Sequence, residues 1–161
     1  MPIIKLITII HAPIERCFDL SRNLDLHMTS SSQTGEKAVG GITHGLINFG
    51  EEVTWKAKHF GVWQQLTSRI TAYERPHHFR DSMVRGAFKR IDHDHFFESQ
   101  GDATKMIDVF NFNAPLGLLG TIAESFFLTN YLKRFLEERN VCIKNAAESD
   151  EWKYFLPTKN L

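Results

Sequence analysis

The sequence lacks long apolar runs, has no excess of either charge and contains only two cysteines. Nineteen Lys and Arg residues balance nineteen Asp and Glu residues, so the composition indicates no basic surface of the kind that nucleic-acid binding requires. The apolar start MPIIKLITIIHAP alternates, has no basic leading region and reaches Pro13 early, which fits neither a membrane span nor a signal peptide. We therefore expect a cytoplasmic protein with no nucleic-acid partner and no stable membrane insertion.

The two cysteines, Cys17 and Cys142, are far apart in the sequence and show no CxxC spacing. Both fall in segments with helical patterns, so we expect free thiols rather than a disulfide. With 161 residues the chain has the length of one domain, 1–161, in which 149–161 forms a C-terminal tail. The sequence gives no indication of the oligomeric state.

Aromatic residues, by contrast, are abundant. Thirteen Phe and three Trp residues can fill a core or line an apolar pocket. An Ile-rich segment at 3–10 predicts a strand, Pro13 begins a short helical pattern, and a second short helix is expected at 24–30. The glycines within 35–50 indicate a bent strand or a loop.

Five strand-like runs occupy 51–112, separated by breaks that carry Gly or Pro at hairpin length. They predict an antiparallel meander. Residues 118–147 then show the longest helical pattern, with an apolar stripe on one side and Lys and Arg on the remaining face. The stripe contains Leu119, Ile122, Phe126, Leu132, Phe135, Leu136 and Ile143.

The turn lengths of the meander predict which residues lie opposite each other on neighbouring strands. Directly opposed residues share a face of the sheet, so four independent turns test one assignment of faces. The expected pairs are His59 with Val62, Ala57 with Gln64, Trp55 with Leu66, Ala72 with Phe79, Ile70 with Asp81, Ser68 with Met83, Asp81 with Ile91, Phe79 with His93, Phe97 with Met106, His95 with Asp108 and His93 with Phe110.

These pairs agree on one covered face and one face in water. The covered face carries Val53, Trp55, Ala57, His59, Leu66, Ile70, Phe79, Met83, Ile91, Phe97, Met106, Phe110 and Phe112. The other carries Thr54, Lys56, Lys58, Arg69, Thr71, Arg80, Arg90, Asp92, Asp94, Lys105 and Asn111. In the segment IDHDHFF, His93 and His95 therefore point inward, beside Asp81 and Asp108. Four ionisable groups on an apolar face need partners, because burying them unpaired is costly.

Three stretches carry a family resemblance: APIERCFDL at 12–20, DSMVRGAFKRIDHDHFF at 81–97, and GDATKMIDVFNFNAPLG at 101–117 ahead of a helix with FLEERN. Together with the order of elements, they resemble the START-related superfamily of polyketide cyclases, pollen-allergen-like proteins and lipid-transfer domains, and in particular its bacterial branch of uncharacterised ligand-binding and cyclase/dehydrase-like proteins. The resemblance covers nearly the whole chain. It implies an α+β helix-grip fold, in which a curved antiparallel sheet of six or seven strands wraps around the long C-terminal helix. Two short helices follow the first strand, and an apolar cavity lies between sheet and helix.

The residues expected around this cavity combine apolar and ionisable side chains. They are Trp55, His59, Leu66, Ile70, Phe79, Asp81, His93, His95, Asp108, Phe110 and Phe126. We expect two contacts among them, His95 with Asp108 and His93 with Asp81. A metal needs three or four converging ligands. The two histidines supply two and Asp108 can supply a third, but no further His or Cys lies in reach, so we expect neither a metal nor a cofactor.

Three functions from different classes fit this sequence. The favoured one is a carrier or sensor that binds a small apolar or lipid-like molecule in the cavity. The second is a cofactor-free enzyme of cyclase or dehydratase type, with His93, His95, Asp81 and Asp108 as its candidate catalytic residues. The third is an interaction module whose helix end and C-terminal aromatic residues bind a partner protein. The identity of the ligand does not follow from the sequence.

Overall fold

Seven antiparallel strands form one sheet in the computed structural model, which describes residues 2–114 and 122–158. The strand order is β1-β7-β6-β5-β4-β3-β2, so only the β1–β7 pair joins strands that are not consecutive in the sequence. The strands are β1 (Ile3–Ile10), β2 (Lys37–Gly41), β3 (Glu52–His59), β4 (Val62–Glu74), β5 (His78–Arg85), β6 (Arg90–Gln100) and β7 (Ala103–Asn113). The expected meander is confirmed, and the glycine-rich segment supplies β2.

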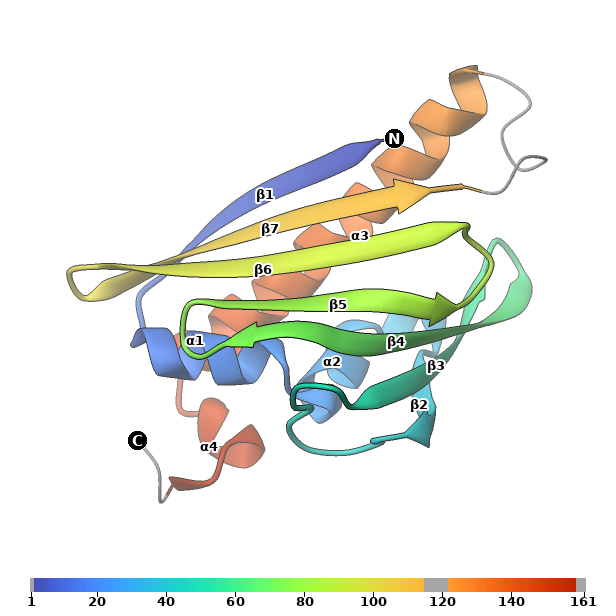
Figure 1. Cartoon of the computed structure of the whole chain (residues 1–161). Helices are drawn as coiled ribbons and strands as arrows, with labels where there is room; N and C mark the ends of the chain where they lie inside the picture. Colours follow the sequence, from blue (N-terminus) through green and yellow to red (C-terminus); the bar gives the residue numbers. More distant parts are fainter. Residues whose placement is uncertain (1, 115–121, 159–161) are drawn as a thin grey trace.

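One long helix crosses the sheet, and two short helices lie at one end of it (Figure 1). The helices are α1 (Ile14–Ser21), α2 (Leu24–Ser30), the 3-10 helix η1 (Ser32–Thr34), α3 (Ile122–Glu148) and α4 (Trp152–Phe155). The expected start of the long helix at residue 118, with Leu119, lies outside the described residues. This is the α+β helix-grip arrangement that the resemblance implied. No helix in the described parts of the chain is long and apolar enough to cross a membrane.

The register of the sheet agrees with the turn lengths at two of the four hairpins. All expected pairs of β3 with β4 and of β6 with β7 are confirmed, including His95 opposite Asp108. Between β4 and β5 the expected pairs of Ile70 with Asp81 and Ser68 with Met83 are confirmed. A register shift lies between Ile70 and Ala72, so Ala72 pairs with Arg80 and the expected pair of Ala72 with Phe79 is wrong. The bulge adds one residue to β4 at this point.

The expected register of β5 with β6 is wrong by two residues. Asp81 lies opposite His93 rather than Ile91, and Phe79 lies opposite His95 rather than His93. The cause is a longer connection, since β5 ends at Arg85 and β6 begins only at Arg90. A shift by two residues leaves every side chain on its expected face, because side chains alternate with a period of two.

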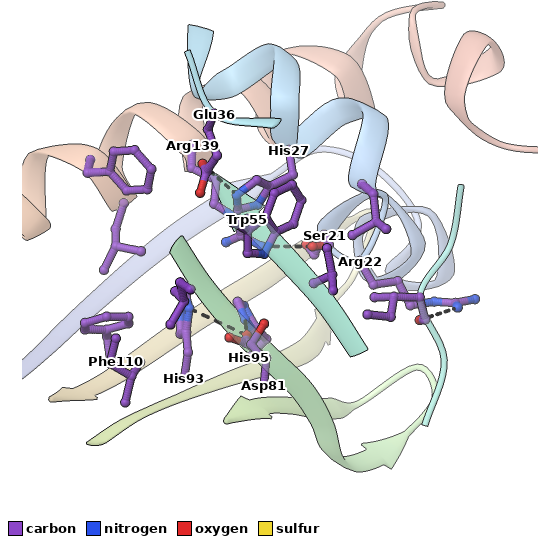
Figure 2. Close-up of a pocket in the computed structure, with 18 of the residues that line it drawn as sticks. Ser21, Arg22, His27, Glu36, Trp55, Asp81, His93, His95, Phe110 and Arg139 are labelled. Carbon is purple, nitrogen blue, oxygen red and sulfur yellow. Dashed lines mark hydrogen bonds and ion pairs between the residues drawn. The ribbon is translucent and has the colours of Figure 1, made fainter. Parts of the chain in front are cut away.

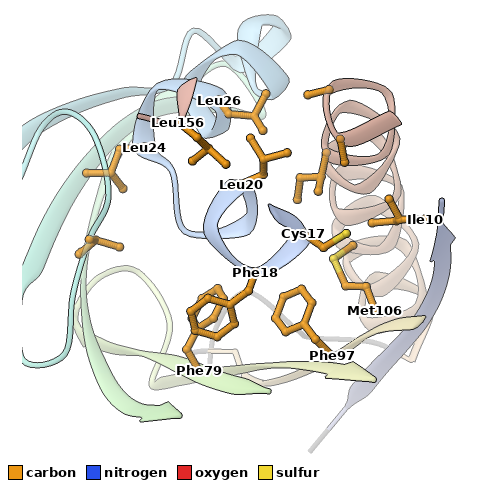
Figure 3. Close-up of a cluster of buried hydrophobic side chains, with 14 of the residues drawn as sticks. Ile10, Cys17, Phe18, Leu20, Leu24, Leu26, Phe79, Phe97, Met106 and Leu156 are labelled. Carbon is orange, nitrogen blue, oxygen red and sulfur yellow. The ribbon is translucent and has the colours of Figure 1, made fainter. Parts of the chain in front are cut away.

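The covered face of the sheet packs on α1 and α3. Phe18 of α1 is fully buried and makes edge contacts with three rings of the sheet, Tyr73, Phe79 and Phe97, at centroid distances of 5.5, 5.3 and 5.4 Å. Figure 3 shows Phe18 pointing from α1 onto the sheet beside Phe79 and Phe97. Nearby Cys17 is buried and is a free thiol, as expected. This cluster holds α1 across the end of the sheet.

The C-terminal tail docks on the same core. Leu156 is buried there, and Trp152 and Phe155 pack partly buried against the core cluster. The side-chain amide of Asn23 donates a hydrogen bond to the carbonyl of Phe155 at 3.0 Å. Trp152, Phe155 and Leu156 of the tail therefore pack on the core, whereas Tyr154 is exposed.

The two aspartates of IDHDHFF do not point into water, which corrects the sequence-based expectation. They lie on the outer face of β6 as expected, but Asp92 and Asp94 are both buried, Asp94 with 4% exposed. Asp94 accepts hydrogen bonds from His78 Nε2 at 2.7 Å and from Arg80 Nε at 2.8 Å. The His78 ring also stacks on Phe96 at 4.5 Å. Long side chains of neighbouring strands thus cover the carboxylates, which alternation along one strand cannot show.

Candidate functional site

A cavity of about 170 Å³ lies between the inner face of the sheet and α3. Nine of the eleven residues expected around a cavity line it: Trp55, His59, Leu66, Ile70, Phe79, Asp81, His93, His95 and Phe110. Leu132, Phe135 and Leu136 of α3 add apolar wall, and the other apolar lining residues are Leu24, Ile47, Val53, Phe88 and Ile91. Figure 2 shows His93, His95 and Asp81 together on neighbouring strands, with Phe110 beside them. The cavity therefore has apolar walls and a cluster of ionisable groups at one place.

Phe126 does not line the cavity, which corrects another expectation. Its side chain is 67% exposed, although it belongs to the apolar stripe of the helix pattern. In Figure 1 the first turns of α3 extend past the ends of the strands. The stripe faces the sheet only where the sheet lies beneath it, and the cavity wall begins at Leu132.

Asp108 lies behind the two histidines rather than on the cavity wall. Its side chain is completely buried, and its Oδ1 accepts a hydrogen bond from His93 Nε2 at 2.9 Å. Its Oδ2 accepts one from the side-chain amide of Asn140 at 2.7 Å. Arg139 Nη1 lies 3.6 Å from Oδ1, and Arg139 Nη2 donates to the carbonyl of Ser21 at 2.8 Å. Buried Asp108 of β7 thus connects His93 of β6 with Asn140 and Arg139 of α3.

The histidine–aspartate hydrogen bonds connect the opposite partners from those expected. His93 bonds Asp108, and His95 Nε2 bonds Asp81 Oδ2 at 3.0 Å. The expected partners are close, with His95 Nδ1 3.0 Å from Asp108 Oδ1 and His93 Nδ1 3.9 Å from Asp81 Oδ2. However, His95 Nδ1 is buried without a hydrogen-bond partner. Side chains on strands lean along the strand, so a diagonal neighbour can be the better partner.

Aromatic rings hold the two imidazoles in place. His95 stacks on Phe79 at a centroid distance of 4.2 Å, and His93 meets the ring of Phe110 edge-on at 5.2 Å. The centroids of the two imidazole rings lie 3.8 Å apart. This packing fixes both rings on the cavity wall.

Burial and mutual contact set the charges in this cluster. Burial lowers the pKa of His93 to about 4, with a further contribution from neighbouring His95, so His93 is a neutral imidazole at neutral pH. Burial alone would raise the pKa of Asp108, but the interactions with His93 and His95 hold it well below its usual range. For Asp81 burial again opposes ionisation, and the interactions with His95 and His93 lower its pKa. Both carboxyl groups are therefore ionised.

Sequence reasoning missed Arg139, although the sequence held a signal for it. Arg139 follows Leu136 by three residues and precedes Ile143 by four, so it lies in the apolar stripe rather than on the remaining basic face. The structure buries its side chain and places it on the cavity wall. A charged residue inside an apolar stripe is the kind of exception that marks a site.

A second polar group at the cavity was also missed. His27 of α2 and Glu36 line the cavity, and His27 Nε2 lies 3.1 Å from Glu36 Oε2. The His27 ring stacks on Trp55 at 4.3 Å, while His59 Nδ1 meets the hydroxyl of Tyr131 at 2.7 Å. Neither His27 nor Glu36 lies on the central strands, so strand alternation gave no signal for these two residues.

Two potential nucleophiles near the cavity are not activated. The Ser21 hydroxyl donates to the carbonyl of Cys17 at 2.8 Å within its own helix. The Cys17 thiol is buried, and burial raises its pKa to about 11. The cluster of histidines and aspartates, by contrast, can move protons or bind a cation. One potential metal-ligating atom from each of Asp81, His93 and His95 lies within 4.8 Å of the other two.

No protein-family model matches this chain, and no curated protein matches it. Solved structures, however, are similar over most of its length. The Zhui aromatase/cyclase from Streptomyces sp. R1128 matches with a TM-score of 0.72 and 12% identity, over 91% of this chain and 93% of that chain. A START superfamily protein from Mycobacterium smegmatis matches with a TM-score of 0.68 and 9% identity, over 91% and 97%.

A plant protein is also similar in structure over most of the chain. Ginseng major latex-like protein 151 from Panax ginseng has a TM-score of 0.63 and 15% identity, over 97% of this chain and 98% of that chain. Identities this low establish the fold and leave the activity open. The expected resemblance is thus confirmed for the architecture, and the chain shares the helix-grip fold of these structures.

Proposed function

We propose that this protein binds a small, mostly apolar molecule in the cavity between the sheet and α3. The observation that carries the proposal is a cavity whose walls are apolar and aromatic, with ionisable side chains gathered at defined positions. Ligand sites commonly combine an apolar surface with a few polar groups that orient the ligand. The whole chain, 1–161, would then act as one ligand-binding unit.

The volume of the cavity indicates the size of the ligand. An apolar cavity of roughly 150 Å³ holds one benzene molecule, and this cavity measures about 170 Å³. A smaller hollow of about 70 Å³ shares Trp55, Leu66 and Phe88 with it. We therefore propose a ligand with one or two rings rather than a long acyl chain.

The ionisable cluster indicates where the polar end of the ligand lies. The Asp81 side chain is 28% exposed, whereas Asp108 behind it is fully buried. A hydroxyl group on the ligand can donate to Asp81 of the sheet, and Arg139 of α3, which also lines the cavity, can donate to a ligand oxygen. A ring that carries a hydroxyl group, which can both donate and accept, meets both requirements.

The enzyme hypothesis is the second candidate, and one observation favours it. The neutral imidazole of His93, oriented by Asp108, lies on the cavity wall, where a general base is needed. The interaction-module hypothesis is less favoured, because Trp152, Phe155 and Leu156 pack on the protein's own core.

Occupancy of the cavity can be tested by filling it. Leu66→Trp places an indole in the cavity, and Val62→Trp adds the same side chain to an exposed position of the same strand. With 2-naphthol as the probe, we expect saturable binding to the wild type and to Val62→Trp, and at least tenfold weaker binding to Leu66→Trp. Equal affinity for all three proteins would contradict binding in this cavity. Native mass spectrometry of freshly purified protein would show any retained ligand.

A further inference from the structure

Asp81, His93 and His95 bring three potential metal-ligating atoms together on the cavity wall. Asp81 Oδ2 lies 3.0 Å from His95 Nε2 and 3.9 Å from His93 Nδ1. Ligands about 2.1 Å from a tetrahedral ion are separated by about 3.4 Å. The two observed distances lie on either side of that value, so an ion fits between these atoms after small adjustments.

Asp108 contacts the other nitrogen of each imidazole. His93 Nε2 lies 2.9 Å from Asp108 Oδ1, and His95 Nδ1 lies 3.0 Å from the same oxygen. Both rings therefore present one nitrogen to a fully buried carboxylate and the other toward Asp81. Histidines that bind metals usually donate their second N–H group to a carboxylate in this way, which fixes the ring and its tautomer.

The His95 imidazole lies between two carboxylates, with Nε2 3.0 Å from Asp81 Oδ2 and Nδ1 3.0 Å from Asp108 Oδ1. A neutral imidazole has one N–H group, so one of its nitrogens must face an aspartate oxygen with a lone pair. In the structure His95 Nε2 bonds Asp81, and buried Nδ1 has no hydrogen-bond partner despite its distance of 3.0 Å to Asp108. If Nδ1 carries the proton, a cation between Nε2 and Asp81 satisfies both sides.

The charges of the cluster also leave room for a cation. The carboxylates of Asp81 and Asp108 carry two negative charges, and the Arg139 guanidinium near Asp108 supplies one positive charge. A divalent ion next to Asp81 would be attracted by both carboxylates and would remain accessible through the cavity, which all three proposed ligands line.

We propose that Asp81, His93 and His95 bind a divalent transition-metal ion at the cavity wall, and that Asp108 orients both imidazoles from behind. Two imidazoles and one carboxylate suit zinc, iron, cobalt or nickel better than calcium or magnesium, which prefer oxygen ligands. Coordination positions on the cavity side would stay open for water or for an oxygen atom of a ligand.

This proposal replaces the expectation of no metal that the sequence supported. That expectation considered Asp108 as the third ligand, whereas the structure makes Asp108 the orienting carboxylate and supplies Asp81 as the ligand. The proposal does not rest on the proposed function, because metal binding needs no organic ligand. A negative metal result would leave the 2-naphthol experiment unaffected.

The test is a titration of chelator-treated protein with Co²⁺, followed by its visible absorption and by calorimetry. We expect one equivalent of Co²⁺ per chain. Asp81→Asn keeps the shape of the side chain and should weaken binding by at least tenfold, and Asp108→Asn should weaken it by about 10- to 100-fold. The control is His44→Ala, which removes an exposed histidine that pairs with Asp25 on the surface and should leave the affinity unchanged. Thermal unfolding curves would show that each variant is folded.

A second measurement uses the wild type alone and does not depend on the folding of any variant. In ¹⁵N spectra of the imidazole rings, diamagnetic Zn²⁺ should shift the signals of His93 Nδ1 and His95 Nε2, while those of His44 should not move. The proposal would be overturned by the absence of saturable binding, by equal affinity of wild type and Asp81→Asn, or by loss of binding in His44→Ala.

Discussion

His93 donates its Nε2–H to Asp108 at 2.9 Å, although the residue directly opposite His93 on β7 is Phe110. The bond runs diagonally across the strand pair, and His95, which does lie opposite Asp108, makes its hydrogen bond to Asp81 on the other neighbouring strand. Because Asp108 is ionised and can only accept, this bond assigns the proton of neutral His93 to Nε2. The lone pair of His93 Nδ1 is then available on the side of Asp81.

Removing Asp108 should destabilise the fold strongly. In Asp108→Ala the buried groups of His93, Asn140 and Arg139 lose their shared acceptor, and a buried guanidinium loses its counter-charge. We expect a loss of about 3 kcal/mol in the free energy of unfolding, measured with urea. Asp150→Ala at an exposed position, with 87% of the side chain accessible, should cost less than about 0.5 kcal/mol. Similar values for the two variants would show that the buried network adds little.

The stability of the metal-free protein should fall between pH 6.5 and pH 4. The pKa of His93 is about 4 in the folded protein, against an ordinary value of 6.5, so the unfolded chain binds this proton first as the pH decreases. The stabilising contribution is complete above pH 6.5 and is lost as the pH falls toward 4, by about 3 kcal/mol in total. Urea unfolding in the presence of chelator at several pH values measures it. His93→Gln should flatten the curve in this window, and an unchanged slope would contradict the assignment.

The two phenylalanines Phe18 and Phe126 should differ in their importance for stability. Phe18→Ala empties the space among three aromatic rings and should cost about 3–5 kcal/mol. Phe126→Ala removes a largely exposed ring and should change stability by less than about 0.5 kcal/mol. Chemical unfolding of the two variants side by side decides this. A large effect at Phe126 would mean that the ring is covered in solution.

Ligand size should determine which compounds stabilise the protein. A ring compound such as 2-naphthol fits the cavity volume and should stabilise the folded state by about 2.7 kcal/mol when its free concentration is 100 times its Kd. Palmitate at the same free concentration should raise the melting temperature less, because its chain exceeds a cavity of about 170 Å³. Differential scanning fluorimetry compares the two. A larger shift with palmitate would indicate that the cavity opens for long chains.

The sequence by itself determined the elements and the faces of the sheet. Alternation along β6 placed His93 and His95 inward beside Asp81 and Asp108, and this result survived a register error between β5 and β6. It survived because the error was two residues, and a side-chain period of two restores the same face. The resemblance to helix-grip proteins added the expectation that the sheet wraps around the long C-terminal helix. Nine of the eleven expected cavity residues followed from these two sources.

Only the tertiary structure decided which histidine meets which aspartate. That choice depends on how each ring leans along its strand and on the stacking of His95 with Phe79, neither of which is encoded in the period of a strand. The structure also moved Phe126 out of the cavity and brought Arg139 into it. Helical periodicity gives the angle of a residue around the helix, but the extent of the sheet beneath that helix decides whether the residue is covered. Contacts of this kind join segments distant in the sequence, so they exist only once the chain is packed.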